Sequence, residues 1–204
     1  MKDNPAITDA CRHNDRFDAE AAREIRGRDN FDDRNIRDEY KNLSNEEIKN
    51  KRKKNHLVAI LSNNIRDFNF GSVIRSACCL GVERVVFTTS RKYDRRGTVG
   101  AHKYMDIDYI LEPLDAIEHY RELGYTVIAA EYDEKYEMQS LYDYKWDEKT
   151  AVIFGEEGTS LPDDILKAVD DIVCIPMPGG IPRSLNLGVS SGIFFSHYAM
   201  QHPL

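Results

Sequence analysis

The chain has no apolar run approaching the roughly 18 residues that a membrane-spanning helix requires. Its first five residues, Met-Lys-Asp-Asn-Pro, are mostly polar and do not resemble a secretory signal peptide. The four cysteines form no Cys-x-x-Cys pair, which argues against a zinc site or a disulfide scaffold. Together these absences predict a cytoplasmic protein with reduced thiols and no bound metal.

Basic residues are also fewer than acidic ones: the chain has 28 Lys and Arg and 35 Asp and Glu, for a net charge of -7. A nucleic-acid-binding protein usually carries a basic surface. The bases are concentrated in two runs, residues 49–54 and 91–96, and such runs are most often solvated faces. Because both runs flank the motifs described below, five residues are candidates for contact with a nucleic-acid backbone: Lys51, Arg52, Lys53, Arg95 and Arg96.

The 204 residues are enough for one domain of ordinary size and an appendage. Residues 1–54 are rich in Arg, Asp and Asn, poor in aliphatic side chains, and predict a charged, partly helical N-terminal extension. Ser44 and Glu47 have the spacing of a capping box, which predicts the start of a short helix. We assign residues 55–204 to a single folded domain.

Short apolar runs alternate with segments of helical periodicity throughout that domain. The expected strands are 57–61, 82–88, 107–110, 125–130, 151–154 and 172–175, and the expected helices are 71–80, 113–124, 161–169 and 187–200. Alternation of this kind predicts an α/β fold, with a mostly parallel sheet and helices on both faces.

Three polar motifs each follow an expected strand, where open α/β sheets bind their ligands. The first is Asn64-Ile-Arg-Asp-Phe-Asn-Phe-Gly-Ser-Val-Ile-Arg75, and the second is Phe154-Gly-Glu-Glu-Gly158. The third joins Ile175-Pro-Met177 to Ser184-Leu-Asn186. No Gly-x-Gly-x-x-Gly follows the first strand, so a Rossmann-type dehydrogenase is disfavoured.

In this order, the three motifs resemble the SpoU (TrmH-like) branch of the SPOUT superfamily, whose members methylate RNA ribose 2′-hydroxyls. The resemblance covers residues 57–201 and implies S-adenosyl-L-methionine as cofactor, a structured tRNA or rRNA as substrate, and a homodimer. It also implies a SPOUT-type C-terminal trefoil knot. Two departures are Ser160, where the family often has glycine, and a third-motif loop that is one residue longer.

Methyl transfer to a ribose hydroxyl requires positioning of the donor and acceptor and removal of the hydroxyl proton. Arginine is a poor general base because its pKa exceeds about 12. We therefore expect Arg75 to orient the hydroxyl, bind the adjoining phosphate and stabilise developing negative charge. The resemblance implies catalytic roles for Arg75, Asn69, Glu157, Ser184 and Asn186, with Asn69 capping the helix of Arg75 and Glu157 ordering its own loop or binding Arg75.

The resemblance also indicates where the cofactor would bind. Backbone groups near Ile175 and Leu185 would hold the adenosyl group, and Gly155 would let the backbone approach it closely. The full set of expected cofactor-binding residues is Ala129, Ala130, Gly155, Ile175, Met177 and Leu185.

Two alternatives keep the same fold. One is methylation of a base in place of the ribose, and the other is an RNA-binding module without catalytic activity. The second alternative is favoured by the acidic domain, the longer third loop and Ser160. The segment 95–103, which mixes basic residues with glycine, suits a loop that grips RNA in either case.

Overall fold

The computed structural model describes residues 36–62, 69–155, 160–180 and 184–204. The chain divides into two compact units, Met1–Asn42 and Leu43–Leu204. The described part of the first unit contains one short 3-10 turn, η2 (Asp38–Tyr40). The second unit contains every element discussed below.

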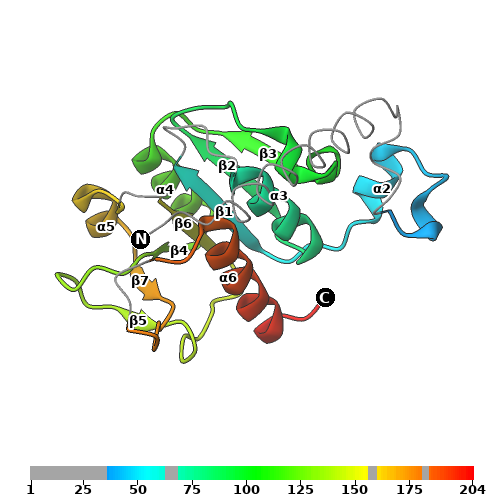
Figure 1. The fold of residues 1–204 in the computed structure, drawn as a ribbon. Coiled ribbons are helices and arrows are strands. Elements are labelled where there is room, and N and C mark those ends of the chain that lie inside the picture. The colour runs from blue at the N-terminus through cyan, green and yellow to red at the C-terminus, as the bar shows by residue number, and fades with distance from the viewer. Residues whose placement is uncertain (1–35, 63–68, 156–159, 181–183) are drawn as a thin grey trace, which may run out of the picture. The chain divides into compact units, whose positions relative to one another are not determined.

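The second unit is built on a seven-stranded sheet in the order β3-β2-β1-β6-β4-β7-β5 (Figure 1). Every strand pairing among the described residues is parallel, which agrees with the mostly parallel sheet predicted from the sequence. The two-residue strand β5 was not predicted, because it is too short to show a periodicity. The strands are β1 (Leu57–Ser62), β2 (Arg84–Thr88), β3 (Asp106–Tyr109), β4 (Thr126–Ala130), β5 (Gln139–Ser140), β6 (Thr150–Phe154) and β7 (Asp171–Cys174).

Helices cover both faces of the sheet (Figure 1). In β1 the side chains alternate between two cores: Leu57, Ala59 and Leu61 belong to one, and Val58 and Ile60 belong to the other. The first core includes side chains of α3 (Asn69–Cys79) and α6 (Leu187–Gln201). The second includes side chains of α4 (Pro113–Glu122) and α5 (Asp163–Ala168). Because both faces of β1 are covered, all six of its residues are buried.

Small residues bring α3 and α6 close together. A Cβ built at Gly188 would lie 2.9 Å from the Cβ of Ser72, whereas one built at Gly192 would lie 3.8 Å from the Ser76 hydroxyl. The pairs are spaced four residues apart on both helices, so they lie along one face of each. Gly188 therefore marks the tightest part of this contact.

The helix boundaries follow local signals in the sequence. Helix α2 (Asn45–Lys51) begins with the predicted capping box, in which Ser44 accepts from the Glu47 backbone N–H and Glu47 accepts from that of Ser44. Pro113 opens α4, and Gly124 follows its end with a φ of 81°. Helix α5 is shorter than predicted, because Pro162 and Val169 both have extended backbones. No helix in the described ranges is both long and apolar enough to cross a membrane.

Candidate active site

The strands that precede the three motifs are close neighbours in the sheet. β1 precedes the first motif, β6 the second and β7 the third, and the order β1-β6-β4-β7 places them at one carboxyl edge. Parallel strands bring the segments that follow them to the same edge. Residues 64–68 of the first motif and Glu157 of the second lie outside the described residues.

A hydrogen bond joins the first and third motifs directly. The Asn186 side-chain amide donates to Asn69 Oδ1 at 2.8 Å, across 117 positions of sequence. Asn186 Oδ1 accepts from the Gly188 backbone N–H at 2.9 Å and so caps α6. Because that oxygen caps the helix, the NH2 group of Asn186 must be the one that faces Asn69. Asn69 was predicted to cap α3 but is instead its first helical residue.

Arg75 lies on the exposed side of α3, beside an open pocket of about 400 Å³. No hydrogen bond or ion pair joins its side chain to another residue in the described ranges. The pocket is lined by Ser72, Arg75, Ser76, Cys79, Leu80 and Gly97. The sequence analysis missed Ser72, Ser76 and Cys79 as lining residues. Ser72 and Cys79 lie three and four positions from Arg75, which is the spacing of one helix face and could have identified them.

The residues expected to hold the cofactor occupy the same carboxyl edge. Ala129 and Ala130 end β4 and pair in register with Ile153 and Phe154 of β6, the two residues before Gly155. Ala130 also pairs with Val173 of β7, two residues before Ile175. Ala129 is buried, whereas Ala130, Gly155 and Ile175 are half-buried.

Two apolar side chains of the third motif are exposed. Met177 and Leu185 each keep 39% of their surface accessible, on either side of the segment 181–183, which lies outside the described residues. Ser184 is also exposed. The structure therefore brings apolar and hydroxyl groups of the third motif to the surface, where a ligand can contact them.

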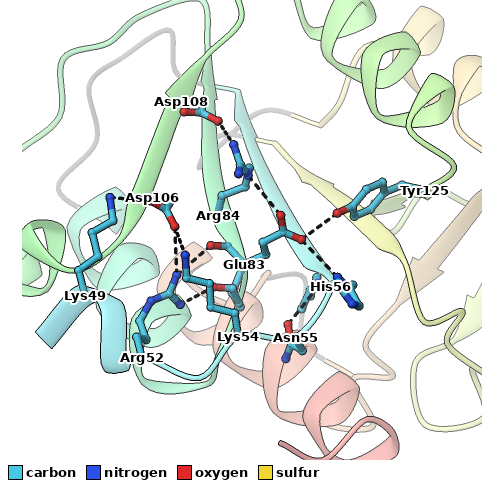
Figure 2. Close-up of polar contacts among 12 residues, drawn as sticks. Lys49, Arg52, Lys54, Asn55, His56, Glu83, Arg84, Asp106, Asp108 and Tyr125 are labelled. Carbon is cyan, nitrogen blue, oxygen red and sulfur yellow. Dashed lines mark hydrogen bonds and ion pairs between the residues drawn. The ribbon is translucent and has the colours of Figure 1, made fainter. Parts of the chain in front are cut away.

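The first basic run has a structural role that the sequence analysis did not foresee (Figure 2). Arg52 was predicted to contact RNA, but its side chain is only 7% exposed. Its guanidinium donates to the backbone oxygens of Val82 at 2.6 Å and Glu83 at 2.8 Å. These contacts argue against an RNA contact for Arg52, because both terminal nitrogens of its guanidinium donate to the loop before β2. Lys51 and Lys53 remain exposed.

Asp106, the first residue of β3, forms ion pairs with three basic side chains of this run (Figure 2). Lys49 Nζ lies 2.6 Å from its carboxylate, Arg52 lies 3.7 Å away, and Lys54 also forms an ion pair with it. Burial opposes the charged form, but hydrogen bonds from Lys49 and Lys54 outweigh it and lower the pKa of Asp106 to about 2. This cluster, here called the Asp106 clamp, ties α2 to the amino-terminal edge of the sheet.

The second basic run lies on the long connection between β2 and β3. Arg95 and Arg96 are exposed within a 3-10 turn, η3 (Arg95–Thr98), and Asp94 caps this turn by accepting from the Arg96 backbone N–H. A second turn, η4 (Ala101–Lys103), follows it. Among the described residues, no group of His, Cys, Asp and Glu side chains has the arrangement of a metal site.

Comparison with known proteins identifies the family. The model of the SpoU rRNA Methylase family matches residues 56–196. The tRNA (guanosine(18)-2′-O)-methyltransferase of Aquifex aeolicus is 24% identical over 151 residues, which are 72% of this chain and 70% of that enzyme. An uncharacterized tRNA/rRNA methyltransferase of Archaeoglobus fulgidus is 31% identical, over 67% of this chain and 61% of the relative.

Solved structures show the same fold. The TrmH/SpoU tRNA modifying enzyme of A. aeolicus superposes with a TM-score of 0.68 and 20% identity, covering 78% of this chain and 82% of that one. The SpoU methyltransferase AviRb of Streptomyces viridochromogenes, solved with AdoMet, gives a TM-score of 0.61 and 22% identity, covering 73% and 59%. The match spans only 56% of the 23S rRNA (guanosine-2′-O-)-methyltransferase RlmB of Vibrio vulnificus, so several relatives are considerably longer than the region they share.

Proposed function

The chain belongs to the SpoU rRNA methylase family, and on this premise we propose that it methylates the ribose 2′-hydroxyl of a structured tRNA or rRNA. The observation that carries the proposal is the 2.8 Å bond between Asn186 and Asn69. It joins the start of α6 to the start of the helix that bears Arg75. The two motifs thus form one polar site at the carboxyl edge of the sheet. The relatives named above as tRNA or rRNA 2′-O-methyltransferases support the choice of reaction.

We propose S-adenosyl-L-methionine as the cofactor, which supplies an already activated methyl group. The chain's residues fit this group, because Ala129, Ala130 and Gly155 place little or no side chain beside the strand ends. Exposed Met177 and Leu185 are suited to cover an adenosyl group, with Ile175 contributing from the end of β7. AviRb, solved with AdoMet, supports the assignment.

The protein groups would act on the acceptor. Arg75 would orient the ribose hydroxyl and its phosphate, and stabilise negative charge as the proton leaves. Asn69 would be held in place by Asn186, while Ser184 would lie near the reacting centre. A role for Glu157 remains part of the proposal on the basis of its motif position alone.

Three further features are proposed from the family. The first is the C-terminal trefoil knot, and the second is a charged extension, residues 1–54, ahead of the SPOUT domain of residues 55–204. The third is a homodimer, for which α6 offers an exposed apolar side chain near each end: Val189 is 52% exposed and Met200 is 77% exposed. We propose Lys51, Lys53, Arg95 and Arg96 as RNA contacts, since all four are exposed.

The test is methyl transfer from labelled S-adenosylmethionine to unmodified total RNA, followed by digestion to nucleosides, with Arg75→Ala beside the wild type. Label in a 2′-O-methylnucleoside that the variant loses supports the proposal. Label on a base would replace the ribose reaction with base methylation. Cofactor binding without transfer to any RNA would contradict the proposal and favour the non-catalytic RNA-binding module.

A further inference from the structure

We propose that residues 89–105, here called the basic loop, form a pre-ordered platform that binds the RNA phosphate backbone beside the target nucleotide. The inference rests on the proposed function, and it adds which surface of the protein holds the RNA strand. It also separates the two basic runs, which the sequence alone presents as equivalent.

Positive charge is concentrated on the basic loop. It carries five Lys and Arg and one acid, Asp94, for a net charge of +4, in a chain whose net charge is -7. All five cationic side chains are exposed: Arg91, Lys92, Arg95, Arg96 and Lys103. Phosphate groups along an RNA strand complement such a surface, and their binding releases counterions.

The backbone of the basic loop is anchored without any ligand. The Tyr93 ring stacks on Phe87 of β2, with centroids 5.0 Å apart and planes 10° from parallel. Buried Thr98 donates to the Arg95 backbone oxygen at 2.8 Å, and Tyr109 donates to the Thr89 oxygen at 3.1 Å. Because these contacts fix the loop in advance, binding of a phosphate costs less conformational entropy.

The side chain of His102 adds a further anchor. Its Nδ1 lies 2.7 Å from the Thr98 hydroxyl oxygen. Whichever of the two groups donates, this bond ties the His102 ring to Thr98. Turns η3 and η4 are thereby joined through one buried hydroxyl.

The basic loop also lies directly against the helix of Arg75. A Cβ built at Gly71 would come within 2.7 Å of Gly97 Cα and 2.8 Å of the Asp94 backbone oxygen. No larger residue at position 71 would allow this approach, because both neighbours are backbone atoms. Gly97 and Arg75 consequently line the same pocket of about 400 Å³. A strand bound along the loop would pass beside the residue proposed to contact the target ribose.

The other basic run differs in its surroundings. Lys49, Arg52 and Lys54 are engaged by the Asp106 clamp at the amino-terminal edge of the sheet. In the basic loop, the single acid Asp94 is engaged by one cation, Arg96. The two regions therefore differ in how their acid is used: Asp106 engages three cations at the amino-terminal edge of the sheet, whereas Asp94 engages one in the basic loop.

The experiment measures binding of unmodified bulk tRNA as a function of salt concentration. Two double variants lose the same charge: Arg95→Gln/Arg96→Gln in the basic loop, and Lys135→Gln/Lys145→Gln, two exposed lysines outside both basic runs. The logarithm of the association constant decreases linearly with the logarithm of the salt concentration. If Arg95 and Arg96 each contact a phosphate, the magnitude of that slope should be smaller by about 1.4 to 1.8 in the loop variant. The charge-conserving variant Arg95→Lys/Arg96→Lys should restore most of the wild-type slope. The lysine control, Lys135→Gln/Lys145→Gln, should keep the wild-type slope.

A wild-type slope in the loop variant would overturn the inference, as would an equal decrease in the lysine control. Methyl transfer by the wild type is measured in parallel. If transfer occurs but the slope does not depend on the loop, the inference fails and the proposed function stands. If the slope depends on the loop but no methyl is transferred, the platform stands and the methyltransferase proposal fails.

Discussion

Asn186 uses both halves of its side-chain amide, accepting from the Gly188 backbone N–H and donating to Asn69 Oδ1 at 2.8 Å. One side chain thus caps α6 and fixes the rotation of Asn69 at the start of α3. The stability of a helix end and the geometry of the candidate active site are linked through this residue. A substitution that preserves the cap and removes the donor should separate them.

Asn186→Asp should lower methyl transfer while changing stability little. An aspartate still caps α6, but a carboxylate oxygen replaces the amide that donates to Asn69. Asn186→Ala should lose both functions and cost about 1–2 kcal/mol of unfolding free energy. Urea unfolding and transfer of labelled methyl to RNA measure the two effects. Full activity in Asn186→Asp would show that the site does not need an amide donor from position 186 to Asn69 Oδ1.

Gly188→Ala should destabilise the fold, whereas Gly192→Ala should not. A Cβ at position 188 would lie 2.9 Å from Ser72 Cβ and force α3 and α6 apart, at a cost of about 1–3 kcal/mol. At position 192 the nearest atom is at 3.8 Å, so the better helix propensity of alanine should add up to about 1 kcal/mol. Thermal unfolding of both variants checks this. Equal stability of the two would refute the close packing at Gly188.

Asp106→Asn should cost about 1–3 kcal/mol near neutral pH, because the buried Arg52 and two lysines lose their shared carboxylate. Asp108→Asn is the control, since Asp108 is 46% exposed and its pair with Arg84 should contribute no more than about 1 kcal/mol. Chemical unfolding at pH 7 compares the two variants. A smaller effect from Asp106 than from Asp108 would contradict the clamp.

The Asp106 contribution should also depend on pH. Its pKa is lowered from its ordinary value to about 2 in the folded state, so the folded protein favours the ionised form. The stabilisation is complete above the unfolded pKa and decreases as the pH falls from about 5 towards 2. The stability difference between the wild type and Asp106→Asn should shrink over this range. A constant difference would rule out ionisation of Asp106 as its source.

His197 should make the fold less stable in mild acid. The Trp146 indole N–H donates to His197 Nδ1 at 2.8 Å, which requires that nitrogen to be unprotonated. Burial, followed by the charge of Lys145, lowers the pKa of His197 below the ordinary value for histidine. The folded state therefore favours neutral histidine, and its contribution is present above about pH 6.5 and lost as the pH falls. His197→Gln keeps an acceptor but cannot titrate, so its stability should change less between pH 7.5 and 5.5.

Much of the fold could be predicted from local pattern. The expected strands and helices were found with small shifts at their ends. Buried parallel strands can be recognised because they are runs of apolar residues. Helix ends can be recognised from capping residues such as Ser44 and Gly124. β5 and the 3-10 turns of the basic loop could not be predicted in this way. They are short, and their conformations depend on contacts such as that of Tyr93 with Phe87.

By itself, the sequence determined the alternation of strands and helices, the order of the three motifs and hence the family. Those properties follow from periodicity and from residue type at fixed spacing. Tertiary structure alone decided which basic residues face solvent and which neutralise Asp106, and it joined Asn69 to Asn186. The physical reason is that charge pairing and hydrogen bonding depend on distances between atoms far apart in the chain. Lys-Arg runs of similar composition can therefore become a structural clamp at one edge of the sheet and an exposed surface beside Arg75.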